Sequence, residues 1–345
     1  MAGRPDMAVV PTPAPRWLAL SDHAGPVAAT ALPDLLQRGT LVLELTQPKP
    51  GPSVLLDYRA KASAPCVLSI LSDPIAGISL LHRQGVALQR CHLPGPLPQN
   101  WALARLTYCW DAAARTWALH LEDTAGTWTL LSVGPNPIPP GTADLLAMCA
   151  GPGAARRAAA VQWFGVCEVS PPAPPATWIG GRSPVQTPRG PVAAADLRPG
   201  DLVATPDQGP LPIHAIRSLT LPNRGRFAPV LLRAPYFARH VDLLVSQAQP
   251  TLLSGAGVEY LFGEDAVLAP AAALRDGNTA LSDDRRPITA CVALDLGKPA
   301  LIIADGCPLL CSLKPAMALP YRLLQDYEVL PLQALLGRGS HRNAA

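Results

Sequence analysis

The stretch from Asp242 to Leu253, DLLVSQAQPTLL, places polar residues between two apolar segments. The apolar ends are typical of buried strands. Between them, Ser246, Gln247 and Gln249 carry hydroxyl and amide groups, which need hydrogen-bond partners wherever they are buried. Pro250 follows directly and interrupts the run. The stretch is therefore either a turn between two strands or the remainder of a site where chemistry once took place.

The cysteines are the other residues whose chemistry could define a site. There are eight of them: Cys66, Cys91, Cys109, Cys149, Cys167, Cys291, Cys307 and Cys311. No CxxC pair occurs, and the last two have no histidine or second cysteine pair beside them, so we predict no zinc site and no cofactor. Most of the cysteines lie in apolar runs such as LTYCW and APCVL, which predicts buried thiols.

The composition indicates a folded, strand-rich protein. Of 345 residues, 49% are hydrophobic and 15% are charged, which excludes a chain that is disordered throughout. The 41 prolines are more than twice the average share of roughly 5%, and they favour short strands and many turns over long helices. The formal net charge of +3 is small, and neither half of the chain is strongly basic, so we expect no nucleic-acid partner.

The first residues and the longest apolar runs show whether the sequence contains a signal peptide or a membrane span. The start, MAGRPDMAVVPTPAPRW, has no apolar core of the kind that a Sec signal needs. No apolar run reaches the roughly 18 residues that span a bilayer. We therefore expect a soluble protein without a membrane span, either cytoplasmic or exported by a route that the sequence does not show.

Short segments with strand character follow one another from about residue 17 to residue 169. The predicted strands are residues 39–47, 53–60, 66–72, 78–84, 101–110, 116–123, 127–133 and 161–170. Their spacing predicts an all-β sandwich, and the piece ARLTYCWDAAARTWALHLEDTAGTWTLL predicts a three-stranded meander. This pattern resembles the concanavalin-like jelly roll of lectin, glucanase and laminin-G modules.

The resemblance bears on what this module could bind. It implies a glycan or a protein ligand, although the E-x-D-x-x-E spacing of the glucanases' paired acids is missing. Five tryptophans lie between residues 101 and 163. Exposed indole rings could stack on sugars, but in a sandwich most tryptophans belong to the core, and we predict the core for these.

Proline-rich and helical segments mark the predicted domain boundaries. The sequence EVSPPAPPAT, residues 168–177, is typical of a semi-rigid linker. We predict a disordered tail at 1–16, the sandwich at 17–169, the linker at 170–177, a second domain at 178–325 and a helix with a tail at 326–345. Helical spacing begins near residue 316 and ends near Gly337, and Pro331 leaves open whether the segment is one helix or two.

The second half resembles the Hint (Hedgehog/intein) family in its bacterial stand-alone form. After a short strand at residues 185–187, the family pattern T-P-x-G…L-x-x-G-D-x-V-x-T-x-D-x-G is matched in order by Thr187, Pro188, Gly190, Leu197, Gly200, Asp201, Val203, Thr205, Asp207 and Gly209. Three further blocks match, at residues 242–253, 259–274 and 302–306. The resemblance covers about residues 177–325 and implies an all-β Hint fold that follows the sandwich.

The resemblance also implies a reaction and the positions that perform it. In working members a cysteine or serine attacks the preceding carbonyl, a histidine protonates the departing nitrogen, and donors hold the oxyanion. Counting back from Thr187, the nucleophile falls on Trp178, or on Thr177 with a one-residue gap. The S-x-x-H block keeps Ser246 but has Gln249 at the histidine.

Few residues could replace the missing nucleophile and histidines. Threonine is a weak nucleophile without a base, and the next histidine in the sequence after Thr177 is His214. The histidine of the closing block falls on Pro299, or on Lys298 with a gap. His240 could substitute from a neighbouring strand, but we expect it in an exposed turn.

Three reactive positions are therefore changed together while the turn residues are kept. We predict a Hint-domain protein without autoprocessing activity, whose role is binding or structural, and which is not an enzyme in the usual sense. The alternative is a self-cleaving protein that is cut near Ala176–Trp178 by a shift of the peptide bond to an ester.

Overall fold

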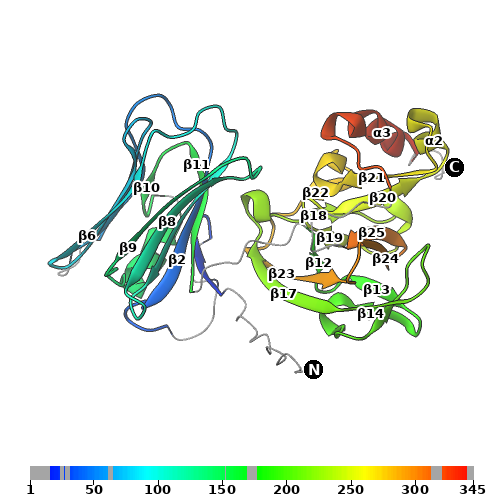
Figure 1. The fold of residues 1–345 in the computed structure, drawn as a ribbon, viewed down its shortest axis with the longest axis horizontal. Coiled ribbons are helices and arrows are strands. Elements are labelled where there is room, and N and C mark those ends of the chain that lie inside the picture. Colours follow the sequence, from blue (N-terminus) through cyan, green and yellow to red (C-terminus); the bar gives the residue numbers. More distant parts are fainter. Residues whose placement is uncertain are drawn as a thin grey trace, which may run out of the picture.

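The computed structural model describes residues 16–23, 27, 32–60, 65–151, 153–168, 177–311 and 321–339. Two bodies built mainly from antiparallel strands lie side by side, one from each half of the chain (Figure 1). This confirms the predicted mainly β class. The predicted tail and linker, and Ala176 at the predicted cleavage point, lie outside the described residues; only Arg16 and Thr177 at their edges are described.

The first body, residues 16–168, is a sandwich of two antiparallel sheets. One sheet has the order β1 (Trp17–Leu20), β11 (Val161–Cys167), β2 (Arg38–Leu45), β7 (Ala104–Asp111), β8 (Thr116–Asp123) and β9 (Thr129–Pro135). The other has the order β10 (Arg156–Arg157), β3 (Ser53–Arg59), β4 (Cys66–Asp73), β5 (Gly77–Gln84) and β6 (Ala87–Pro94). Helix α1 (Thr142–Cys149) contributes to the core between the sheets.

Alternation along the strands builds the core of the sandwich. In β7, every second residue is buried, so Leu106, Tyr108 and Trp110 point inward. Three of the five tryptophans between residues 101 and 163 are buried, namely Trp101, Trp110 and Trp163. The other two are half-buried and pack against the same core. The prediction that these rings belong to the sandwich core is therefore confirmed for Trp101 and Trp110 and partly met for the two half-buried rings, whereas Trp163 is buried in a cluster shared with the second body.

The second body, residues 177–339, is called the C-terminal module here. Its first sheet has the order β17 (Ala215–Pro222), β23 (Ile288–Asp295), β12 (Ile179–Gly180), β19 (Leu243–Val245), β18 (Val230–Leu232) and β22 (Ala280–Ser282). Its second sheet has the order β14 (Gly190–Ala193), β13 (Pro184–Thr187), β24 (Ala300–Ala304), β25 (Cys307–Cys311), β20 (Pro250–Ser254) and β21 (Ala266–Pro270). A two-stranded ribbon joins β15 (Leu202–Val203) to β16 (Leu211–Pro212).

The residues that carry the family resemblance act here as turn formers. The Thr187 hydroxyl donates to the carbonyl of Gly190 at 2.6 Å, and the Thr205 hydroxyl donates to that of Gly209 at 2.6 Å. The Asp201 carboxylate accepts the backbone N–H of Arg198 at 2.8 Å. These side chains replace backbone hydrogen bonds that a tight turn cannot make, which explains why such residue types recur at this spacing.

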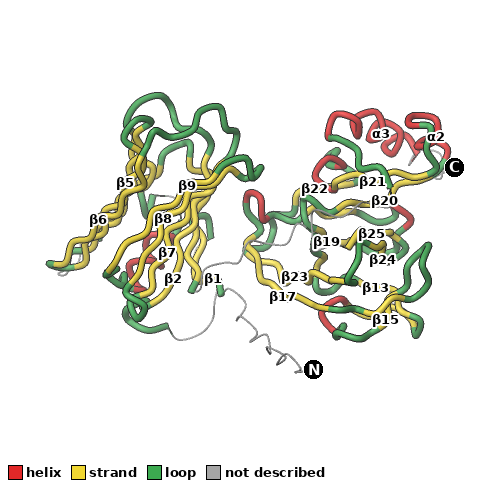
Figure 2. The backbone as a smooth tube through the Cα atoms, in the orientation of Figure 1, coloured by secondary structure: helices red, strands yellow, loops and turns green. Residues whose placement is uncertain are grey.

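Short helices cover one end of the C-terminal module. Strands dominate both bodies, whereas α2 (Ala256–Phe262) and α3 (Asp326–Gly339) lie together at the outer end (Figure 2). The predicted helical segment is one helix, α3, with Pro331 inside it. The predicted start near residue 316 is wrong for residues 321–325, which are not helical, and residues 312–320 lie outside the described part. Four short 3₁₀ turns complete the module: η1 (Ala194–Asp196), η2 (Gly225–Phe227), η3 (Tyr236–Ala238) and η4 (Ala271–Leu274).

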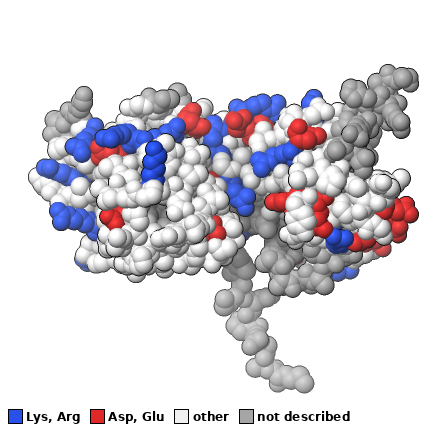
Figure 3. Space-filling model, turned by 90° about the horizontal axis from the view of Figure 1, so that it is seen from above, with Lys and Arg blue, Asp and Glu red and all other residues white. Residues whose placement is uncertain are grey.

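The two bodies share one hydrophobic cluster. From the sandwich it contains Trp17, Leu20, Val42, Trp163 and Cys167; from the C-terminal module it contains Trp178, Leu219, Leu221, Phe227, Cys291 and Ala293. On the face drawn in Figure 3, basic and acidic side chains lie interspersed across the molecule.

Within the described residues there is no helix with the length and apolar character to cross a bilayer.

Candidate functional site

Trp178 and Ser246 meet at the start of the C-terminal module. Trp178 directly precedes β12, and its carbonyl accepts the backbone N–H of Ser246 at 2.9 Å. The Trp178 side chain is 4% exposed and belongs to the cluster shared with the sandwich. Thr177 is 7% exposed. The residue at the position where the resemblance places the nucleophile is therefore a buried packing residue.

The stretch that joins β19 to β20 is a turn between two different sheets. The backbone N–H of Gln249 donates to the carbonyl of Ser246 at 3.1 Å. The Gln249 side chain is 1% exposed, and its amide donates to the carbonyl of Leu310 at 2.7 Å and to that of Pro250 at 3.2 Å. Gln249 therefore ties the turn to β25, and both of its side-chain donor bonds end on main-chain oxygens.

The side chain of Gln247 also ties the same turn to a distant segment of the chain. Its side-chain amide donates to the carbonyl of Gly225, the first residue of η2, at 2.8 Å and to that of Ala228, the residue after η2, at 3.1 Å. Its own carbonyl accepts the backbone N–H of Ala272 at 2.8 Å. The polar centre of DLLVSQAQPTLL is thus an assembly point for three segments that lie far apart in the sequence.

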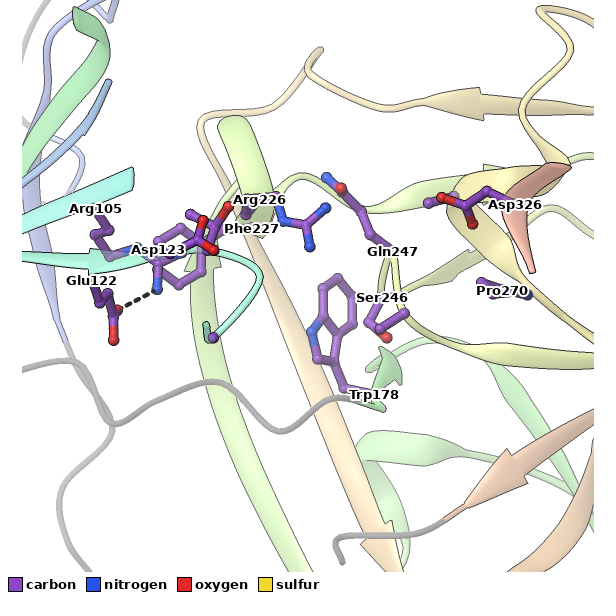
Figure 4. A pocket seen from close by; sticks show the side chains of 14 residues that line it. Arg105, Glu122, Asp123, Trp178, Arg226, Phe227, Ser246, Gln247, Pro270 and Asp326 are labelled. Atoms are coloured by element: carbon purple, nitrogen blue, oxygen red, sulfur yellow. Dashed lines mark hydrogen bonds and ion pairs between the residues drawn. The ribbon is translucent and has the colours of Figure 1, made fainter. Parts of the chain in front are cut away.

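A pocket of about 460 Å³ opens where the two bodies meet (Figure 4). Trp178, Ser246 and Gln247 line it from the C-terminal module, together with Arg226, Phe227, Ala248, Pro270, Ala272 and Asp326. The sandwich contributes Arg105, Glu122, Asp123, Thr124 and Gly126. The structure therefore brings Trp178 and Ser246 together in one cavity, whereas Thr177 and Gln249 are not among its lining residues.

The sandwich side of this pocket carries an ion-pair network. The Arg105 guanidinium lies 2.8 Å from a Glu44 oxygen and 3.5 Å from a Glu122 oxygen. A hydrogen bond from the Thr127 hydroxyl, with backbone donors and Arg226 nearby, lowers the pKa of the Asp123 carboxyl. Sequence reasoning missed these residues because nothing local links residues 105–126 to residues 178 and 246.

The two histidines considered as substitutes do not line the pocket. The His240 side chain is 88% exposed, and its ring lies 3.4 Å from the Asp305 carboxylate, which confirms the predicted exposed position. His214 is also exposed, and its ring packs beside the backbone of Gly297. Lys298 is exposed in the same turn between β23 and β24.

The thiol of Cys291 lies in the same cluster as Trp178. Seven of the eight cysteines are buried and Cys109 is half-buried, so the prediction of buried thiols holds for seven. Burial raises the pKa of the Cys291 thiol, which lies in the shared cluster, to about 12. Because the thiolate is the reactive form, Cys291 is not an activated nucleophile.

Comparison with known proteins identifies the C-terminal module. Residues 181–313 match the family described as "Hint domain"; the match contains Ser246 and Gln249 and begins after Thr177 and Trp178. The curated proteins compared include no match to this chain.

Solved structures give only distant similarities. A CBM40 of the Ruminococcus gnavus IT-sialidase has 14% identity and a TM-score of 0.26, covering 46% of this chain and 75% of its own. A SAP-like pentraxin from Limulus polyphemus has 9% identity and a TM-score of 0.23, covering 44% of this chain and 63% of its own. Scores this low assign no ligand to the sandwich. The family match identifies one part of the chain: residues 181–313 are a Hint domain.

Proposed function

We propose that this protein is a Hint-domain protein that no longer processes itself and whose Hint domain serves as a structural partner of the sandwich. The observation that carries the proposal is the side chain at the nucleophile position. Trp178 is 4% exposed and packs in the cluster shared by the two bodies. An indole has no group that can attack a carbonyl, so the residue contributes to packing instead of chemistry.

The position of the family's histidine supports the same conclusion. A general acid must exchange a proton near the working pH, and an amide has no such equilibrium. Both donor bonds of the Gln249 amide end on the carbonyls of Leu310 and Pro250. The side chain is therefore committed to holding β20 and β25 together, and it does not face the pocket that Trp178 and Ser246 line.

The binding role of the proposal belongs to the sandwich. A groove of about 710 Å³ lies along β2, β7, β8 and β9, with Ala118, Val133 and Pro135 in its lining. Val133 is 68% exposed, and Leu131 on the same strand is 63% exposed. An apolar lining suits a protein segment better than a sugar, which needs many hydrogen-bond partners. We expect the full chain to bind nothing on a glycan array, whereas specific binding would assign a glycan.

The intact mass of the purified chain tests the loss of processing. The chain is incubated with thiol and, in parallel, with hydroxylamine, because both cleave an ester or thioester intermediate. We expect one species of 36.2 kDa under both conditions. Two fragments with a new terminus near Trp178 would establish the alternative, a self-cleaving protein.

A variant at Thr177 identifies the nucleophile if fragments form. Thr177→Val keeps the size of the side chain and removes its hydroxyl. Fragments that persist in this variant would exclude Thr177 as the attacking group, whereas their loss would assign the reaction to it.

A further inference from the structure

A fully buried carboxylate lies at the boundary between the sandwich and the Hint domain. The Glu44 side chain, on β2, is 0% exposed. Within the sandwich it accepts hydrogen bonds from the Arg105 guanidinium at 2.8 Å and from the Trp163 indole N–H at 3.0 Å. Its third donor comes from the Hint domain, since the backbone N–H of Arg226 lies 2.9 Å from Oε2.

The Hint segment that reaches Glu44 is the turn η2, and its shape fits the site closely. Gly225 has a φ of +52°, and a Cβ atom placed on it would lie 1.8 Å from Oε2 of Glu44. Only glycine therefore permits this approach. Phe227 follows, with its ring centroid 6.2 Å from that of Trp17 and 5.9 Å from that of Trp163.

The guanidinium of Arg105 lies over the ring of Phe227 and adds a contact between the two bodies. It lies 4.1 Å from the centroid of Phe227 while it remains paired with Glu44. The cation is therefore shared between a carboxylate of its own body and an aromatic ring of the other. A buried carboxylate is stable only when its lone pairs are satisfied, so the sandwich presents a socket that is incomplete without η2.

Contacts around this centre extend the interface. The Trp17 indole N–H donates to the carbonyl of Thr220 at 3.2 Å. Arg224 forms an ion pair with Asp22, and the same guanidinium donates to the carbonyl of Asp284 at 3.0 Å. A central aromatic and charged anchor surrounded by polar contacts is the arrangement that carries most of the binding energy in stable protein interfaces.

We infer that the sandwich and the Hint domain form a noncovalent pair, in which the turn Gly225–Arg226–Phe227 occupies the Glu44 socket, and that the pair persists without the linker between them. A cut in the linker then produces a nicked complex and does not release either half. This inference does not depend on whether the Hint domain is active.

Separating the two halves covalently tests the inference. A site for a specific protease is placed within residues 170–176 of the full chain, and the cut protein is compared with the uncut protein by size-exclusion chromatography with light scattering. We expect both to elute with the same mass at micromolar concentration. Two separate fragments from a chain that was folded before the cut would overturn the inference.

Two glycines provide matched variants for the contact itself. Gly225→Ala places a methyl group against Glu44, whereas Gly209, which also has a positive φ of +68°, has no heavy atom within 4 Å of its Cβ position. In the cut protein we expect Gly225→Ala to raise the dissociation constant at least about 30-fold, the size of a hot-spot loss. Gly209→Ala carries the same backbone strain and should leave the constant unchanged.

A variant on the sandwich side tests the same contact without changing the turn η2. Glu44→Gln keeps the size of the side chain and replaces one acceptor oxygen by a donor that faces Arg105 or Arg226. It should weaken the cut complex in the same direction while circular dichroism of the uncut variant stays native. Equal affinity of Gly225→Ala, Glu44→Gln and the parent would show that η2 is not the anchor. Spontaneous cleavage of the unmodified chain would instead contradict the proposed function and leave the cut-complex result intact.

Discussion

Gln249, at the position where the family resemblance places a histidine, has a structural task in this protein. Its amide bonds to Leu310 and Pro250 are buried, so truncation would remove two buried hydrogen bonds. We expect Gln249→Ala to lower the free energy of unfolding by about 1–3 kcal/mol, measured by urea denaturation. Gln247→Ala, at a half-buried site in the same turn, should have a smaller effect. Equal losses in the two variants would contradict this assignment.

Local residue types were readable from the sequence, whereas their distant partners were not. The threonines, glycines and aspartates of the Hint turns act within three or four residues of their own position, and local spacing predicts such contacts. Gln249 and Leu310 are 61 residues apart, so nothing in the sequence indicates their bond. The glutamine at this position was visible in the sequence, but its hydrogen bond to Leu310 was not predictable.

His82 provides a pH-dependent prediction at the scale of one residue. The ring is 0% exposed in the sandwich core, and neither nitrogen hydrogen-bonds to any described residue. Burial lowers the pKa of His82, although the Gln84 side chain, the Asp144 carboxylate and the Ile138 backbone favour the protonated ring. The unfolded chain therefore binds more protons in acid than the folded chain does.

Acid therefore lowers the stability of the folded protein through His82. The stability contributed by neutral His82 is complete above the unfolded pKa of about 6.5 and is lost as the pH falls below it. We expect His82→Leu to flatten the decline in the urea midpoint between about pH 7 and pH 5. His92→Leu, at an exposed site on the neighbouring strand β6, should keep the parent's decline. A parental slope in His82→Leu would show that other groups cause the acid sensitivity.

At the scale of elements, the hairpin of β24 and β25 is fixed to the turn before β19 by one aspartate. The Asp305 carboxylate accepts the backbone N–H groups of His240 at 2.7 Å and Val241 at 2.6 Å. Partial burial opposes ionisation, but these hydrogen bonds outweigh it and lower the pKa of Asp305. Asp305 has a φ of +47°, a conformation that asparagine also tolerates.

Neutralising this carboxylate should loosen the hairpin. We expect Asp305→Asn to lower the free energy of unfolding by about 1–3 kcal/mol at neutral pH, because charge-assisted bonds become weaker neutral ones. The difference from the parent should shrink as the pH falls through the lowered pKa, since the parent then loses the same charge. Asp207→Asn, in an exposed turn, is the control. A difference that stays constant down to acidic pH would contradict this account.

The elements themselves were predictable where alternation or turn chemistry was strong. Eight predicted strands of the sandwich correspond to strands that shift by at most a few residues at their ends. Strand β6 was missed because its exposed face carries Arg90 and His92, which interrupt the apolar signal. Pro331 was a weak breaker because α3 is held by buried contacts of Val329 and Leu332. The order of strands within the sheets depends on distant pairings and was not predicted.

At the scale of the whole molecule, the sequence predicted two parts but not the contacts between them. The family resemblance and the linker predicted a sandwich followed by a Hint fold. The contact between Glu44 and Arg226 joins residues 182 positions apart, and no periodicity or motif connects them. The pocket beside Trp178 is lined by five residues of the sandwich and nine of the C-terminal module, so neither part alone reveals the whole lining.

The shared interface also predicts how the molecule unfolds. Burying Glu44, Phe227 and Trp178 between the bodies couples their stabilities, because opening either body would expose apolar surface of the other, and opening the Hint domain would also remove the Arg226 donor from Glu44. We expect a single calorimetric transition for the uncut parent and for Gly209→Ala. Gly225→Ala should split it into two transitions, as the sandwich and the Hint domain then unfold separately. Two transitions in the parent would mean that the interface contributes too little to couple the bodies. A single transition in Gly225→Ala would mean that the coupling does not pass through η2.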